Sequence, residues 1–249
     1  MNPHDVNTQW TESPVAIKIR YYVLQQYDAI SIASSLNASR ICSFPHMQQR
    51  QPMARYSLHH ACKGAPIMST DLKDKRIAVL MTDGVEQSEY AEPRQFLEQE
   101  GAKVTLISTK EKGEDIQGFD HMHPGKRFKV ELDVRNARPA DFDALVLPGG
   151  VANPDQLRLH TEAITFIREF GRENKPIAAI CHGPWTLIDA DLVKGKHLTS
   201  WPSLQTDLRN AGAEWSDEEV VVDGKLITSR KPDDIPAFNQ ALKSALAAA

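Results

Sequence analysis

Cysteine and long apolar runs are both scarce in this sequence, and each shortage excludes a class of protein. The three cysteines, Cys42, Cys62 and Cys181, form neither a metal-binding spacing nor a disulfide framework. So few cysteines among 249 residues are typical of a reducing compartment, and we expect a cytoplasmic location. No segment approaches the roughly 20 apolar residues that a membrane-spanning helix needs. We therefore expect a soluble protein.

Basic residues are also outnumbered by acidic ones, which gives a formal net charge of −4. This balance argues against nucleic acid as a partner. Acidic residues are absent from residues 29–67, and residues 1–67 carry six Lys or Arg against three Asp or Glu. A transit peptide has this bias, but the segment is too long and irregular for one. We expect residues 1–67 to be a disordered N-terminal extension, or a mis-assigned start with translation beginning at Met68. In either case they add nothing to the chemistry.

Residues 68–249 instead show the alternating strand and helix patterns of a single α/β domain. Short apolar runs predict strands at 76–81, 103–108, 143–147, 177–180 and 197–201. Helices are expected to end at 100, to include 164–170, to start at 184, and to cover 204–210 and 236–246. Two hairpins are expected, one at 128–132 and one joining 220–222 to 226–228 through Asp223-Gly224. This alternation predicts a doubly wound, mostly parallel sheet flanked by helices.

The most informative stretch is Ala179-Ile180-Cys181-His182-Gly183-Pro184, where a buried strand stops at a thiol and an imidazole. Pro184 is suited to a first helical turn, so Cys181 is expected at a tight turn before a helix. This arrangement is that of a nucleophile elbow, and a helix N-terminus favours a thiolate. A buried cysteine can also be simple core packing. Its position and the adjacent His182 favour a nucleophilic or redox role.

Ligands of doubly wound sheets bind beyond the carboxyl ends of the strands, where three loops carry suggestive residues. The first loop contains Asp83, Glu86 and Glu89, the second contains Gly149-Gly150, and the third is the Cys181 elbow. The His182 N–H and an N–H of Gly149 or Gly150 are candidate donors to an oxyanion.

These motifs resemble the ThiJ/PfpI superfamily, and within it the PfpI-like branch of intracellular peptidases and stress-response deglycases. The resemblance covers about residues 75–242. It rests on Ala179-Ile180-Cys181-His182-Gly183-Pro184, on Leu147-Pro148-Gly149-Gly150, on Glu86 and Glu89, and on Thr228-Ser229-Arg230-Lys231-Pro232-Asp233-Asp234. It implies a flavodoxin-like fold, similar to class I glutamine amidotransferases, and no cofactor.

The resemblance also implies roles for individual residues. Cys181 is the nucleophile, Glu89 donates a hydrogen bond to the thiolate, and His182 is the base. A carboxyl group beside a thiolate in a dry cleft should have a raised pKa, which allows this role for Glu89, whereas Glu86 is expected to be solvated. Asp155, supplied by a neighbouring subunit, orients His182. This arrangement implies a homo-oligomer with its active site at the subunit interface. The remaining candidates for oxyanion or substrate contacts are Gly149, Gly150, Gly183 and Trp185, while Trp185 and Trp201 are expected either to wall the cleft or to pack in the core.

Other histidines carry weaker signals. His121-Met122-His123 has two possible metal ligands, but no third ligand lies near in sequence, so we expect no metal site. A glutaminase triad needs a late His-x-Glu pair, and His197-Leu198-Thr199 does not supply one. The sequence therefore argues against ammonia transfer from glutamine.

Three functions remain open at this point. The first is a cysteine-dependent deglycase or cofactor-free glyoxalase that repairs adducts of glyoxal or methylglyoxal, with small carbonyls or glycated side chains as partners. The second is a cysteine peptidase or amidase that forms an acyl-enzyme. The third is a redox sensor or holdase chaperone in which Cys181 is oxidised under stress. A small pocket at a subunit interface favours the first.

Overall fold

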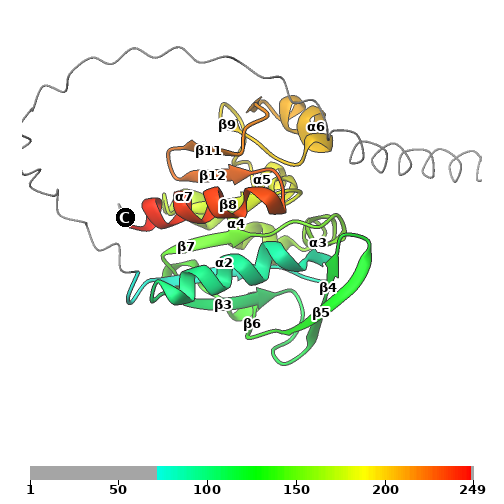
Figure 1. The fold of residues 1–249 in the computed structure, drawn as a ribbon, viewed down its shortest axis with the longest axis vertical. Helices are drawn as coiled ribbons and strands as arrows, with labels where there is room; N and C mark the ends of the chain where they lie inside the picture. The colour runs from blue at the N-terminus through cyan, green and yellow to red at the C-terminus, as the bar shows by residue number, and fades with distance from the viewer. Residues whose placement is uncertain (1–71, 248–249) are drawn as a thin grey trace, which may run out of the picture. The chain divides into compact units, whose positions relative to one another are not determined.

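The computed structural model describes residues 72–247 (Figure 1). The predictions for residues 1–67, for a start at Met68, and for Cys42 and Cys62 lie outside this range. Between Leu72 and Ala247 the chain forms strands and α-helices as follows: β1 Arg76–Leu80, β2 Val85–Glu86, α2 Gln87–Gln99, β3 Lys103–Ser108, β4 Asp115–Asp120, β5 His123–Lys129, β6 Leu132–Asp133, β7 Ala144–Leu147, α3 Ala152–Leu157, α4 Thr161–Arg172, β8 Ile177–Ile180, α5 Pro184–Asp189, β9 His197–Leu198, α6 Gln205–Asn210, β10 Glu214–Trp215, β11 Val220–Asp223, β12 Leu226–Ser229 and α7 Ile235–Ala247.

Seven strands form the central sheet in the order β11-β12-β8-β7-β1-β3-β6. Every neighbouring pair is parallel except β11 with β12. From β1 the chain adds β3 on one side, then returns to add β7 and β8 on the other. The strand order therefore reverses between β1 and β7, as in a doubly wound fold. The predicted fold class is confirmed.

Helices cover both faces of this sheet, with α2 and α7 on the face toward the viewer in Figure 1. Alternate residues of each strand belong to different cores, because successive side chains point to opposite faces. Val146 and Ala178 pack in the core under α2 and α7. Leu145 and Ala179 pack in the other core with α4, whose Phe166 and Phe170 are buried there. β7, β8 and all but the first residue of β1 are buried on both faces, which explains their unbroken apolar runs.

The sequence analysis did not predict the short elements β2, α3 and β10, and several predicted elements differ from the observed ones. The first hairpin pairs β4 with β5 and turns between Asp120 and His123, so it lies earlier than the predicted 128–132. Those residues instead span the end of β5 and the start of β6, which joins the main sheet beside β3. The predicted strand at 197–201 is only the two-residue β9, which pairs with β10 outside the main sheet. The last hairpin turns at Gly224-Lys225, because Asp223 still pairs with Leu226.

No helix between residues 72 and 247 has both the length and the apolar character needed to cross a bilayer.

Candidate active site

The candidate site lies at the carboxyl edge of three adjacent strands. Cys181 follows β8, Gly149 and Gly150 follow β7, and the loop after β1 leads through β2 into α2, which carries Glu89. Because β8, β7 and β1 are neighbours in the sheet, these loops meet beside the point where the strand order reverses.

The turn at Cys181 is a strained elbow. Its φ is +61°, a left-handed conformation that costs a non-glycine residue roughly 1–2 kcal/mol. Backbone hydrogen bonds hold the turn on both sides: the Cys181 N–H donates to the Ser229 carbonyl at 3.0 Å, and its carbonyl accepts from the Trp201 N–H at 2.9 Å. The turn aims the side chain away from the strand direction. An elbow of this kind was predicted.

The two glycines after β7 are required by the closeness of their surroundings. A Cβ atom on Gly149 would lie 2.7 Å from both the Cys181 Cβ and the Glu89 Oε2. Gly150 has a φ of +76°, and a Cβ there would lie 2.2 Å from the carbonyl oxygen of Gly84. The Gly149 N–H donates to Glu89 Oε2 at 2.7 Å, so it is not free for a substrate. The Gly150 N–H interacts with the Cys181 sulfur instead.

Glu89 is fully buried on the first turn of α2. Burial raises the pKa of Glu89 to about 8, and the hydrogen bonds from Gly149 and with Cys181 offset only part of this rise. The carboxyl group is therefore protonated at neutral pH. Its Oε1 atom is buried and has no partner of ordinary geometry within residues 72–247. The carboxyl group as a whole interacts with the Cys181 thiol.

The Cys181 thiol is only 7% exposed. Burial, followed by the negative charge of an ionised Glu89, raises the pKa of the thiol, while the N–H groups of Gly150 and His182 lower it. This is opposite to the predicted stabilisation of a thiolate. The physical reason is that removing the sulfur from water outweighs the field of α5, which has only six residues. Protonation of Glu89 removes the second of these causes, so the thiol ionises more easily while the acid is neutral.

His182 lies beside the sulfur, with its Nδ1 atom 3.2 Å from Cys181 Sγ. Its ring stacks on Trp201 with centroids 5.9 Å apart and meets the edge of Trp185 at 5.5 Å. Burial lowers the pKa of His182 to about 4, so the imidazole is neutral at pH 7. A neutral ring beside a thiol can accept the thiol proton.

No acidic side chain within residues 72–247 contacts His182. Asp155 is exposed on α3, and its side chain makes no hydrogen bond or ion pair with any residue of 72–247. The structure of one chain therefore brings together Cys181, His182 and Glu89 but leaves Asp155 outside the cluster.

Two of the other predicted contacts have structural partners instead. The Gly183 N–H donates to the Ile180 carbonyl at 2.9 Å, and a Cβ there would lie 2.4 Å from the Leu147 carbonyl oxygen. Gly183 therefore serves close packing and offers no oxyanion donor. Trp185 donates its indole N–H to Asp207 at 2.8 Å, so it presents only ring surface to His182.

Two residues of the site escaped the sequence prediction. Glu86 is buried rather than solvated, and its oxygens accept hydrogen bonds from the Ser88 hydroxyl at 3.2 Å and the His121 N–H at 2.8 Å. Asn153 is fully buried, accepts from the Thr82 N–H at 2.7 Å and donates to the Gly149 carbonyl at 3.0 Å. Asn153 thus ties the loop after β1 to the two glycines. No local pattern marks either role, because each depends on a partner far away in the sequence, His121 for Glu86 and Thr82 for Asn153.

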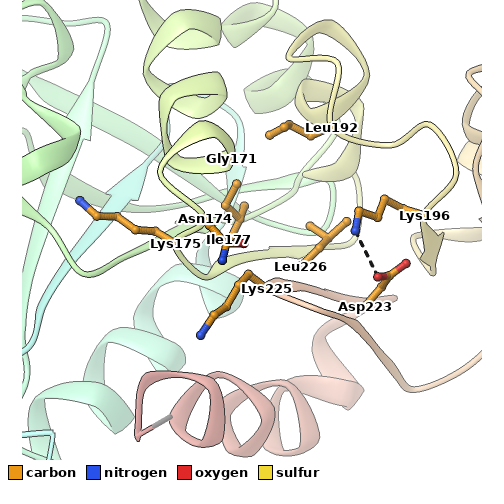
Figure 2. Close-up of a pocket in the computed structure, with 9 residues that line it drawn as sticks. All are labelled: Gly171, Asn174, Lys175, Ile177, Leu192, Lys196, Asp223, Lys225 and Leu226. Carbon is orange, nitrogen blue, oxygen red and sulfur yellow. Dashed lines mark hydrogen bonds and ion pairs between the residues drawn. The ribbon is translucent and has the colours of Figure 1, made fainter. Parts of the chain in front are cut away.

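Groups of three or more His, Cys, Asp or Glu suited to a metal are absent from the described part of the chain, and His121 Nδ1 instead bonds Asp120 at 3.0 Å. A further hollow lies at the opposite edge of the sheet, near the first residues of β8 and β12 (Figure 2). There Lys196 pairs with Asp223 at 3.2 Å, while Lys175 and Lys225 point in other directions.

The fold and the buried cluster define a flavodoxin-like α/β protein with an acid, a cysteine and a histidine at its elbow. The pattern of the DJ-1/PfpI family matches residues 75–245, and the chain belongs to this family.

Known relatives extend this result. YraA of Bacillus subtilis, described as a candidate cysteine protease, is 43% identical over 67% of this chain and 95% of its own. Protein/nucleic acid deglycase 2 of Escherichia coli is 44% identical over 67% of this chain and 94% of its own. The crystal structure of DJ-1beta from Drosophila melanogaster matches with a TM-score of 0.63 and 29% identity, covering 70% of this chain and 91% of that one.

Proposed function

We propose that this protein is a cysteine-dependent hydrolase that repairs or detoxifies adducts of reactive carbonyls such as glyoxal and methylglyoxal. The observation that carries the proposal is the buried Cys181 sulfur, 3.2 Å from a neutral His182 and beside the protonated Glu89. A sulfur that is 7% exposed admits a small aldehyde more readily than a polypeptide backbone. The similarity to a deglycase supports the same reading and adds glycated protein side chains as substrates.

The chemistry needs no external oxidant. His182 takes the thiol proton, and the Cys181 sulfur adds to the aldehyde carbon of methylglyoxal to give a hemithioacetal, with its oxygen near the N–H groups of Gly150 and His182. His182 returns this proton to the hemithioacetal oxygen and then takes the C–H proton, while the neutral Glu89 donates its proton to the ketone oxygen, which gives an enediol. His182 then protonates the former ketone carbon and Glu89 recovers a proton from the hydroxyl on the sulfur-bearing carbon, so the aldehyde carbon becomes a thioester and the ketone carbon an alcohol. Water then cleaves the thioester, which releases lactate and restores the thiol. With an aminocarbinol adduct, the amine leaves as the sulfur adds.

Completion of the site by a second subunit is part of the proposal. The buried His182 has no acid within residues 72–247, while Asp155 is exposed and unpaired on α3. An Asp155 from a second copy of this chain would orient His182 and stabilise its protonated form. The functional unit is then a homo-oligomer, and a cytoplasmic location follows from the thiol chemistry.

A cysteine peptidase is the second candidate, and the similarity to YraA favours it. The same sulfur would attack an amide carbonyl and form an acyl-enzyme. This reaction requires room for an extended chain around Cys181. A non-catalytic redox role of Cys181 is the third possibility.

The decisive experiment measures methylglyoxal consumption and lactate release by the full chain, beside its Cys181→Ala variant, with a fluorogenic peptide as the competing substrate. We expect the wild type to release lactate. The variant should keep its fold but release lactate at least about 10⁴-fold more slowly, because the nucleophile is absent. Lactate release retained in Cys181→Ala would refute the assignment. Peptide cleavage without lactate would make the protein a peptidase, and neither activity would leave the redox role.

A further inference from the structure

A hollow of about 200 Å³ is lined in part by Gly150, whose N–H interacts with Cys181, and Cys181, His182 and Glu89 do not themselves line it. It lies between the tip of the β4–β5 hairpin, the loop after β1 and the start of α3. The residues that line it are Gly84, Glu86, Phe119, His121, Met122, Gly150, Val151 and Ala152. We call it the side pocket.

The hairpin wall of the side pocket is firmly attached to the rest of the site. β2 pairs with β4 through Val85 with Gly118 and Glu86 with Phe119. The buried Glu86 carboxylate accepts the His121 N–H at 2.8 Å and so anchors the hairpin tip. The pocket is thus formed before a ligand arrives, which lowers the entropic cost of binding.

The lining of the side pocket is suited to an apolar group. Phe119, Met122, Val151 and Ala152 supply carbon surface, and both carboxylate oxygens of Glu86 are already occupied by protein donors. Met122 is 81% exposed and Val151 58% exposed, an unusual display of large apolar side chains next to a catalytic edge. An apolar cavity of about 150 Å³ is large enough to hold benzene, so a phenyl ring fits this volume.

Gly150 connects the side pocket to the reacting sulfur. Its N–H interacts with Cys181, while the same residue forms part of the pocket wall. We propose that the side pocket receives the apolar substituent on the carbonyl group that Cys181 attacks, so that alkyl- and aryl-substituted glyoxals are preferred over glyoxal. This inference rests on the proposed carbonyl-repair function. It assigns Phe119, Met122, Val151 and Ala152 to substrate selection and Glu86 to positioning.

The test compares kcat/KM for glyoxal, methylglyoxal and phenylglyoxal in the full chain and three variants. Ala152→Leu narrows the pocket, Met122→Ser removes apolar lining, and Val222→Ser is the matched control, an exposed apolar residue on β11 outside the pocket. Intrinsic aldehyde reactivity cancels when the phenylglyoxal-to-glyoxal ratio of each variant is divided by that of the wild type. We expect this ratio to fall about 10-fold in Ala152→Leu and less in Met122→Ser, and to stay unchanged in Val222→Ser.

A second measurement does not depend on turnover. In the Cys181→Ala chain, benzyl alcohol should shift the methyl NMR signal of Met122, and Ala152→Leu should abolish the shift. If the Met122 signal shifted but the wild type showed no Cys181-dependent turnover of any glyoxal, the apolar pocket would be supported and the proposed function refuted. Unchanged substrate ratios together with an unshifted Met122 signal, in chains that still turn over glyoxal, would overturn the pocket assignment.

Discussion

At the scale of single residues, burial has opposite effects on the two groups that flank the sulfur. It raises the pKa of Glu89 to about 8 and lowers that of His182 to about 4, because in both cases the charged form loses its water. Near pH 7 the acid therefore holds its proton and the base lacks one. This is the pair of states that proton transfer to and from a substrate requires.

Glu89→Gln tests the buried acid through the pH dependence of stability. In the wild type, Glu89 stays protonated in the fold up to about pH 8 but ionises above about 4.5 when unfolded, so the free energy of unfolding falls as the pH rises. His182 opposes this trend only below about 6.5, where the unfolded chain becomes protonated. Between pH 6.5 and 8 we expect a loss of about 1.4 kcal/mol per pH unit, measured by urea unfolding.

Glutamine mimics the neutral acid, so the variant should lose this slope while its activity falls roughly 10²-fold or more. The control is Glu92→Gln, which changes an exposed carboxylate on the same helix and should keep the slope. Equal slopes in the wild type and Glu89→Gln would show that Glu89 is ionised in the fold.

At the scale of elements, three short connections bring the chemistry together. β8 is followed by Cys181, whose backbone is in the left-handed region, and the loop after β7 contains two glycines. α2 begins close to β1 and carries Glu89 in its first turn. Asn153 and Glu86 fasten these connections to one another and to the β4–β5 hairpin. The site therefore depends on loop backbones that tolerate little change.

Gly150→Ala tests this dependence. The added Cβ would lie 2.2 Å from the Gly84 carbonyl oxygen in a backbone with a φ of +76°, so we expect a loss of roughly 2–5 kcal/mol of stability together with most of the activity. Gly113→Ala is the matched control, since its φ is +92° but no atom lies within 4 Å of its added Cβ. It should cost only about 1–2 kcal/mol and leave activity intact. If both variants lost similar amounts of stability, the positive φ alone, and not crowding by neighbouring atoms, would explain why glycine is needed at position 150.

At the scale of the whole molecule, one chain contains only part of the proposed site. Cys181, His182 and Glu89 converge, whereas Asp155 lies exposed on α3. If assembly supplies the missing acid, activity depends on the concentration of subunits as well as on their fold. Dilution that separates the subunits would then lower the activity while each chain stays folded.

Mixing two inactive variants tests the contribution from a second subunit. Asp155→Asn retains the nucleophile and Cys181→Ala retains the acid, so a hybrid oligomer contains one complete site. We expect each variant alone to release little or no lactate, and a mixture refolded or exchanged together to recover roughly a quarter of wild-type activity. The fraction follows from random pairing of subunits in a dimer. A mixture as inactive as its components would place Asp155 outside the site.

The sequence by itself determined the alternation of strands and helices, because strands buried on both faces must be apolar throughout and helices must carry one apolar stripe. It also determined the elbow, since Gly183 and Pro184 allow an abrupt change from β8 to α5. The tertiary structure alone decided the burial of Glu86, the bridging role of Asn153, the packing role of Gly183 and the raised pKa of Cys181. Each of these depends on desolvation or on partners far apart in the chain, such as Thr82 and Asn153, which no local pattern records.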